Sequence, residues 1–115
     1  MLEIKEIGDV SVGYFQNTRI LDEATVQTVG AELLEAAART KDNKLVLNFR
    51  NVVLMSSAMI GKLVLLRNRC KEAGVRLAFC EITENVKEVF MLMKLDQIVD
   101  LYSDQAGALT AMDAF

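Results

Sequence analysis

The fold is decided by the stretch LNFRNVVLMSSAMIGKLVLL, residues 47–66, which begins as a strand and ends as a helix. Its first residues belong to the apolar run KLVLNF, residues 44–49, and short runs of this kind are typical of strands buried on both faces. From Met59 onward the apolar side chains recur at helical spacing. Two hydroxyl side chains, Ser56 and Ser57, stand at the junction of these apolar elements.

Upstream of this stretch, the sequence predicts two short strands and a long helix. The strands are residues 10–16 and 18–21, both rich in β-forming side chains. Because only Asn17 separates them, we expect them to pair antiparallel. The helix begins after Asp22, which can serve as its N-cap, and ends near Thr40. Its apolar stripe consists of Val26, Val29, Leu33, Ala36 and Ala37.

Downstream, helices and strands continue to alternate. Gly74 suits the end of the helix that follows the two serines. Further strands are expected at residues 75–80 and 98–102. Thr83 and Ser103 are placed to cap the two remaining helices. The inward positions expected for these three helices are Met59, Ile60, Leu63, Val64 and Leu66; Val86, Val89, Phe90 and Met93; and Ala106, Leu109 and Met112.

This order of elements predicts an α/β fold. Alternating strands and helices from residue 44 onward imply right-handed crossovers and a largely parallel sheet. The expected architecture is a single mixed, mostly parallel β-sheet with about four α-helices. The chain of 115 residues suits one domain, residues 1–115, and can bury a core without a metal or disulfide.

Composition and charge argue against several classes of function. A net charge of −3 and a pI near 4.9 disfavour direct nucleic-acid binding, which uses a basic face. Histidine is absent and the two cysteines form no CxxC motif, so we expect no metal, no cofactor and no enzymatic activity. No run approaches the roughly 18 apolar residues of a membrane span, and no signal peptide is visible. These features predict a cytoplasmic protein without membrane insertion.

The serine pair is the strongest candidate site. It lies at a helix start, where backbone N–H groups lack acceptors within the helix and the helix dipole is positive. A serine there can act simply as a cap, contributing about 1 kcal/mol. The same N–H groups could hold a phosphate, and phosphorylation would then add a charge of roughly −2 without disturbing the fold. The residues alone leave both interpretations open.

Three other features need an interpretation. Cys70 and Cys80 are expected to be buried apolar side chains. The run of residues 90–93 has more apolar side chains than one helix face can bury, which leaves Met91 or Leu92 exposed as a soft contact surface. Gly61 interrupts a helix at a cost of up to about 1 kcal/mol, and either close packing within the fold or close approach by a partner would explain it.

The chain resembles the STAS domains, and among them the bacterial anti-sigma-factor antagonists. The resemblance covers nearly the whole chain and rests on residues 44–102, from KLVLNFRNVVLMSSAMIGKLVLL to the tail GVRLAFCEITENVKEVFMLMKLDQIVDLY. The family pattern is a buried strand, then Asp-Ser-Ser/Thr-Gly-Leu-Gly, then an apolar helix. The two serines match this pattern, whereas Met55, Ala58 and Ile60 stand where the family has Asp and the two glycines.

The resemblance implies a STAS-like fold and a regulator that acts by binding another protein. It implies Ser56 as the phosphorylated residue, with Ser57 as the second candidate. Its partner would be an anti-sigma factor that is also a serine kinase, and its capture would free a sigma factor. A metal-dependent serine phosphatase would reset the serine. The residues expected to bind the partner are Met55, Ser56, Ser57, Ala58, Met59 and Lys62.

A second hypothesis also follows from the resemblance. STAS domains occur as adaptor subunits of lipid transporters and in sensory assemblies. Met55 in place of the family's Asp favours such a constitutive adaptor, without a phosphorylation switch. The two hypotheses differ in one observable, because an adaptor would bind its partner whatever the state of Ser56.

Overall fold

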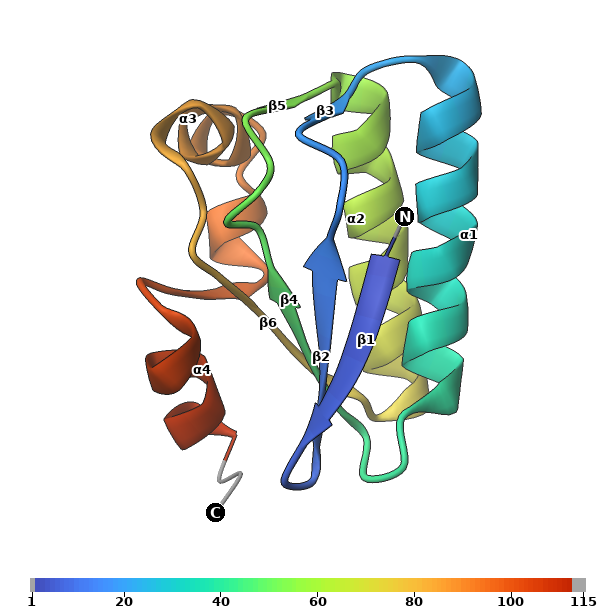
Figure 1. Ribbon diagram of the computed structural model, residues 1–115, viewed down its shortest axis with the longest axis vertical. Coiled ribbons are helices and arrows are strands. Elements are labelled where there is room, and N and C mark those ends of the chain that lie inside the picture. The colour runs from blue at the N-terminus through green and yellow to red at the C-terminus, as the bar shows by residue number, and fades with distance from the viewer. Residues whose placement is uncertain (1, 113–115) are drawn as a thin grey trace.

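A mixed five-stranded sheet forms the centre of the computed structural model, which describes residues 2–112 (Figure 1). The order of its strands is β1-β2-β4-β6-β7. The β1 strand pairs antiparallel with β2, and the other neighbours are parallel. The five strands are β1 (Leu2–Ile7), β2 (Val10–Phe15), β4 (Lys44–Asn48), β6 (Arg76–Cys80) and β7 (Asp100–Tyr102).

Helices cover both faces of this sheet, and the expectation of a mixed, mostly parallel sheet with about four helices is confirmed. The long helices α1 (Glu23–Arg39) and α2 (Ser57–Ala73) lie side by side on one face (Figure 1). Helix α3 (Glu84–Leu92) and the 3-10 turn η1 (Leu95–Gln97) complete the larger core on that side. Helix α4 (Gln105–Ala111) packs on the opposite face over a smaller apolar cluster.

Four phenylalanine side chains hold α3 against the ends of the strands. The ring of Phe49 lies at the centre, 4.7 Å from that of Phe15 and 4.9 Å from that of Phe79. The ring of Phe90, from α3, meets it edge-on at 5.5 Å. Edge-on and tilted contacts of this kind add to the apolar burial, so the cluster fixes the position of α3 on the sheet.

The expected pairing of the first two strands was wrong. Residues 18–21 do contain a strand, β3 (Arg19–Ile20), but it pairs parallel with β5 (Leu54–Met55) in a separate two-stranded sheet. The antiparallel partner of β2 is β1, a strand that was not predicted from the sequence. The sequence of β1, LEIKEI, is half charged and largely exposed, so its apolar signal is weak.

Asp22 and Gly74 bound their helices as expected. Asp22 caps α1, and Gly74 ends α2 with a left-handed backbone, at φ 73°. Thr83 stands at the N-cap position of α3, but its hydroxyl donates to the carbonyl of Val52 at 2.8 Å instead. Ser103 was the wrong cap for α4, because Asp104 accepts the N–H of Gly107 at 2.7 Å.

Two expected core positions are also wrong. Met93 follows the last residue of α3 and is 45% exposed, because the helix ends before the stripe reaches it. Ala106 is exposed at the start of α4, and Ala108 is buried in its place, since the true cap shifts the helix by one residue. The other expected stripe positions lie buried or half-buried in the core.

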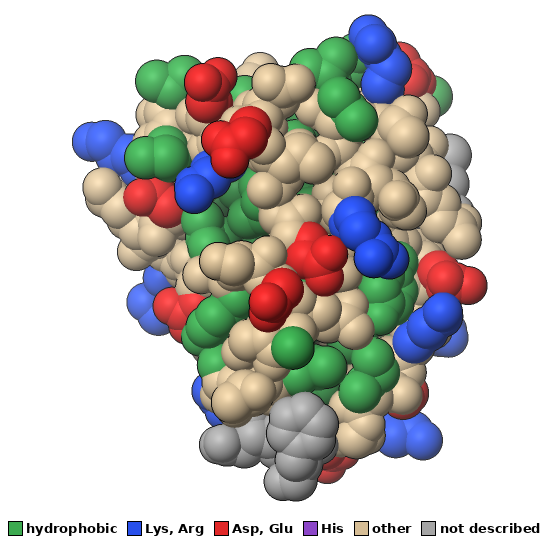
Figure 2. Space-filling model, turned by 60° about the vertical axis from the view of Figure 1, so that its left-hand side comes forward, with side chains coloured by type: hydrophobic (Ala, Val, Ile, Leu, Met, Phe, Trp, Pro, Cys, Tyr) green, Lys and Arg blue, Asp and Glu red, His purple; other side chains and the backbone are tan. Residues whose placement is uncertain are grey.

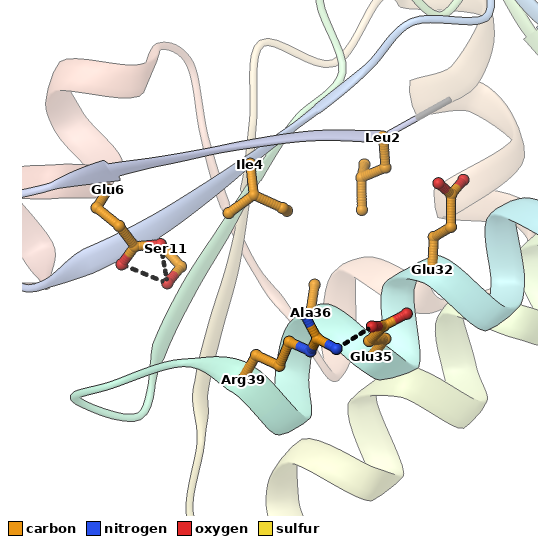
Figure 3. Close-up of a pocket in the computed structure, with 8 residues that line it drawn as sticks. All are labelled: Leu2, Ile4, Glu6, Ser11, Glu32, Glu35, Ala36 and Arg39. Carbon is orange, nitrogen blue, oxygen red and sulfur yellow. Dashed lines mark hydrogen bonds and ion pairs between the residues drawn. The ribbon is translucent and has the colours of Figure 1, made fainter.

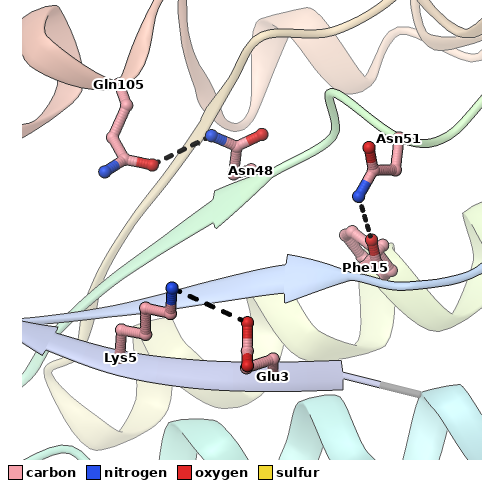
Figure 4. Close-up of polar contacts among 6 residues, drawn as sticks. All are labelled: Glu3, Lys5, Phe15, Asn48, Asn51 and Gln105. Atoms are coloured by element: carbon pink, nitrogen blue, oxygen red, sulfur yellow. Dashed lines mark hydrogen bonds and ion pairs between the residues drawn. The ribbon is translucent and has the colours of Figure 1, made fainter.

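A buried asparagine joins α4 to the sheet. Asn48, at the end of β4, is 3% exposed and uses its whole amide. Its nitrogen donates to Gln105 at 2.9 Å and to Glu81 at 3.2 Å, and its oxygen accepts the N–H of Arg50 at 2.9 Å. Nearby, the exposed Asn51 makes a single 3.3 Å bond to the carbonyl of Phe15 (Figure 4). A buried amide with three partners is costly to remove.

We therefore expect Asn48→Ala to lower the free energy of unfolding by about 2–3 kcal/mol, since its partners lose their bonds inside the protein. The matched variant Asn51→Ala should cost less than about 1 kcal/mol, because water can replace its one exposed bond. Urea denaturation followed by circular dichroism measures both. Equal losses in the two variants would contradict a structural role for the Asn48 network.

Candidate functional site

Ser56 connects β5 to α2 and caps the helix. Its backbone is extended, with φ −76° and ψ 161°. Its hydroxyl accepts the N–H of Met59 at 3.2 Å, and its carbonyl accepts the N–H of Ile60 at 3.1 Å, the first hydrogen bond of the helix. The N–H groups of Ser57 and Ala58 precede that bond, so the helix itself provides no acceptor for them. The capping role expected of Ser56 is confirmed.

The pairing of β3 with β5 brings a second helix start to the same place. Ile20 is paired with Met55, and the N–H of Ser56 donates to the carbonyl of Ile20 at 3.0 Å. Asp22 follows and caps α1 by accepting the hydroxyl and N–H of Thr25 at 2.7 and 3.0 Å, which holds the pKa of Asp22 below its usual value. Both helices therefore begin at one end of the molecule, and their positive dipole ends lie together there (Figure 1).

A hollow of about 380 Å³ lies between these two helix starts. It has two hydroxyl groups, one ammonium group and one carboxylate around apolar side chains. The hollow therefore has no strong net charge, and it is suited to a polar group carried by another molecule. The lining residues are Leu21, Glu23, Val26 and Gln27 from the start of α1, and Ser56, Ser57, Ala58 and Lys62 from the start of α2.

A glycine of the neighbouring helix makes room for the side chain of Lys62 in this hollow. A Cβ atom at Gly30 would come within 3.0 Å of Cδ and 3.1 Å of Cγ of Lys62, so the lysine stem lies directly on the α1 backbone. Its Nζ donates to Oε1 of Gln27 at 3.2 Å. The missing side chain at position 30 therefore lets Lys62 lie flat and place its charge in the hollow.

The structure brings four of the six expected partner-binding residues to this surface. Ser56 and Lys62 are half-buried, and Ser57 and Ala58 are exposed. Met55 and Met59 are not available for contact, since their side chains point into the core and are 7% and 0% exposed. Met55 points inward from β5, where it is paired with Ile20 of β3, and Met59 lies on the buried stripe of α2. We therefore correct the candidate surface by removing these two residues.

The contribution of α1 to the hollow was not predicted from the sequence. Leu21, Glu23 and Gln27 line the hollow although they lie about 30 residues before the serines. Asp22 was recognised as a cap, which marked the start of α1 correctly. Only the parallel pairing of β3 with β5 brings that start beside Ser56, and the expected antiparallel hairpin placed it elsewhere.

The two cysteines lie away from this site and are unreactive. Both are buried, and burial raises the pKa of the Cys70 thiol to about 11 and that of Cys80 to about 12. Thiols with such pKa values are protonated near neutral pH and are poor nucleophiles. Within residues 2–112, no three His, Cys, Asp or Glu side chains lie together as a metal site would require, and no helix has the length and apolar character to cross a membrane.

The end of α3 exposes a short apolar run. Met91 and Leu92 are both exposed, Leu92 by 82%, as expected from the sequence. Figure 2 shows the face that carries α3 and α4, where Lys and Arg side chains are scattered among Asp and Glu. That face therefore has no continuous basic field of the kind that follows a nucleic-acid backbone.

The chain belongs to the STAS domain family, whose family model matches residues 1–108. A curated relative, the anti-sigma F factor antagonist of Paenibacillus polymyxa, is 25% identical over 93 residues, which cover 81% of this chain and 80% of the relative. The resemblance to STAS domains and anti-sigma-factor antagonists is thus confirmed.

Solved structures agree with this assignment. An anti-sigma-factor antagonist (STAS) domain protein from Planctomyces limnophilus is 25% identical, with a TM-score of 0.85 over 96% of each chain. The Bacillus cell fate determinant SpoIIAA in its phosphorylated form is 14% identical, with a TM-score of 0.70 over 97% of this chain and 99% of that one. At that identity, the likeness to SpoIIAA concerns the fold alone.

The geometry of the cap predicts the cost of losing it. We expect Ser56→Ala to lower the free energy of unfolding by about 1 kcal/mol, because the N–H of Met59 loses its acceptor. Ser57→Ala, one residue into the helix and exposed, should stay within about 0.5 kcal/mol of the wild type. Thermal unfolding at matched concentration compares the two variants. A cost at Ser57 as large as that at Ser56 would contradict the assigned cap.

Proposed function

We propose that this protein is an anti-sigma-factor antagonist that binds a kinase-type anti-sigma factor and so frees a sigma factor. The observation that carries the proposal is the hollow between the starts of α1 and α2, which is lined by the half-buried serine that caps α2. Its similarity to named antagonists supports the same class of partner. The proposed activity is binding, not catalysis, and its proposed location is the cytoplasm.

The proposed regulation is phosphorylation of Ser56 by that kinase and its reversal by a metal-dependent serine phosphatase. On the α2 side of the hollow, the N–H groups at the helix start and the ammonium group of Lys62 favour a negatively charged group, whereas the carboxylate of Glu23 belongs to the α1 side. In the unmodified protein, a carboxylate of the partner would take this place. A phosphate on Ser56 would occupy the same donors and add a charge of roughly −2, which would repel that carboxylate.

The departure at Met55 changes the core more than the surface. The side chain at this position points inward from β5 and is almost fully covered. Replacing the family's Asp by Met therefore leaves the exposed lining of the hollow as it is. Partner binding therefore remains part of the proposal even though the family motif is incomplete.

Gly61 supports the position of the proposed interface. A Cβ atom added there would meet nothing within 4 Å, so the fold does not need the glycine for packing. It lies one helical turn after Ser57, on the exposed side of α2. A glycine that weakens a helix without helping its packing is explained if a partner approaches the bare backbone closely.

The second candidate is a constitutive STAS adaptor of a transporter or sensory assembly. The observation that favours it is again Met55, because the residue before Ser56 lacks the carboxylate that the family motif has there. In this case Ser56 would be a cap only, and its charge state would not affect binding. One experiment therefore distinguishes the switch from the adaptor.

That experiment compares the wild type with Ser56→Asp and Ser57→Asp as bait in lysate of the source organism, with bound proteins identified by mass spectrometry. Aspartate is a good N-cap, so Ser56→Asp should remain folded while placing a charge in the hollow. We expect it to weaken capture of an anti-sigma factor at least about tenfold, because like charges at an interface cost several kcal/mol. Ser57→Asp adds the same charge to the lining of the hollow without changing the cap, so a weaker effect there than at Ser56 would locate the switch at Ser56.

Equal capture of a kinase-type anti-sigma factor by all three proteins would contradict the switch. Equal capture of a transporter subunit or sensory scaffold would support the adaptor instead. Circular dichroism of each bait establishes that folding is unchanged.

A further variant tests the position of the interface. We expect Gly61→Leu to raise the free energy of unfolding by up to about 1 kcal/mol, since leucine is a better helix former and has open space there. The same change should weaken partner capture, because the added side chain blocks close approach. Glu72→Leu, exposed near the other end of α2, is the matched control. A stabilised Gly61→Leu that binds normally would remove Gly61 from the interface.

A further inference from the structure

The outer edge of the sheet at β1 is open. The strand lies at the end of the sheet order and pairs with β2 on one side, and no strand among residues 2–112 pairs with its other side. Strand edges of this kind present unpaired N–H and C=O groups and are templates for another strand. The opposite end of the sheet, β7, has only three residues. The six residues of β1 therefore form the longer exposed edge.

The two faces of β1 differ in chemistry. Leu2, Ile4 and Glu6 point toward α1, as Figure 3 shows. Glu3 and Lys5 lie on the other face, where their charges are 3.9 Å apart (Figure 4). Any strand added at this edge would meet Leu2, Ile4 and the carboxylate of Glu6 on the first face, and alternating charges on the second.

The apolar face of this edge is incompletely covered. Ile4 is 41% exposed, although its Cδ1 would lie 3.3 Å from a Cβ at Gly13 and so already rests on β2. A hollow of about 320 Å³ lies beside it, between β1 and α1, with Leu2 and Ala36 among its lining residues (Figure 3). An apolar side chain placed opposite Ile4 would cover it.

Charge selects one register for pairing with an identical strand. In an antiparallel pair centred on Ile4, each Glu3 stands opposite Lys5 of the second copy, so both charge pairs are favourable. Each Glu6 stands opposite an uncharged residue, Leu2. Moving the centre to Lys5 places two lysines opposite each other, and moving it to Glu3 places two glutamates opposite each other. Intermediate registers turn the apolar face of one strand toward the charged face of the other.

We propose that β1 pairs antiparallel with β1 of a second copy, with Ile4 at the centre and Glu3 opposite Lys5 in both directions. The sheet would then continue from one copy into the next. None of the residues that line the hollow at Ser56 lies on β1, so each copy keeps its own partner site. A six-residue strand pair buries less than the roughly 1,600 Å² of a standard interface, so the dimer dissociates on dilution.

Sedimentation velocity over a range of concentrations tests this pairing with a charge swap. The wild type should show a concentration-dependent dimer, and Lys5→Glu should be a monomer because glutamates then face glutamates. The double variant Glu3→Lys/Lys5→Glu should dimerise again, since opposite charges are restored. Both variants lose the contact of Lys5 with the ring of Tyr14, at 5.4 Å, so its loss cannot explain a difference between them.

Cysteine cross-linking tests the register. Paired residues in an antiparallel pair have Cα atoms about 4.5–5.5 Å apart, within the range of a disulfide. Under a mild oxidant, Ile4→Cys should form a covalent dimer several-fold faster than Lys5→Cys, because Lys5 faces Glu3 and its own counterpart lies two residues further along the strand. The native thiols are buried and do not compete.

Three results would overturn the proposal: a wild type that stays monomeric at every concentration, a dimer that Lys5→Glu leaves intact, or Lys5→Cys cross-linking faster than Ile4→Cys. Thermal unfolding of each variant establishes that it is folded.

Discussion

Burial of β4 on both faces is the constraint on which the rest of the structure depends. Leu45 and Leu47 are buried on the face that α1 and α2 cover, while Val46 is buried toward α4. A strand covered on both sides requires helices on both sides, which parallel crossovers provide. The end of this strand then carries two organising groups, the ring of Phe49 in the aromatic cluster and the amide of Asn48 in the network that holds α4.

The candidate site depends on a smaller element outside the main sheet. Two residues of β3 pair with two of β5, and this short ladder places the starts of α1 and α2 side by side. A helix start needs a cap because its first N–H groups have no acceptor in the helix. The same groups attract negative charge, so the structural role of Ser56 and its proposed regulatory role use one set of donors. Phosphorylation at such a place would alter the surface while leaving the core unchanged.

Two of the three departures from the family motif lie in the core and one lies on the surface. Met55 is a core residue here, and Ile60 is fully buried in α2, so both substitutions supply apolar packing. Ala58 is the one departure on the exposed surface of the hollow. The glycines that matter to the surface stand elsewhere: Gly30 makes room for Lys62, and Gly61 leaves the backbone of α2 bare.

The sequence by itself determined the main elements, the α/β class and the helix start at Ser56, because these depend on local patterns: apolar periodicity, capping residues and a glycine after α2. It did not reveal β1, because the charged residues of this strand leave little apolar signal. It did not reveal the cap of α4 either, because Ser103 and Asp104 are adjacent and both are good capping residues. The partner of β3, the inward direction of Met55 and the share of α1 in the hollow were decided only by the tertiary structure. Each of these depends on contact between segments about 30 to 35 residues apart, and a local pattern contains no information about which distant segment a strand will pair with.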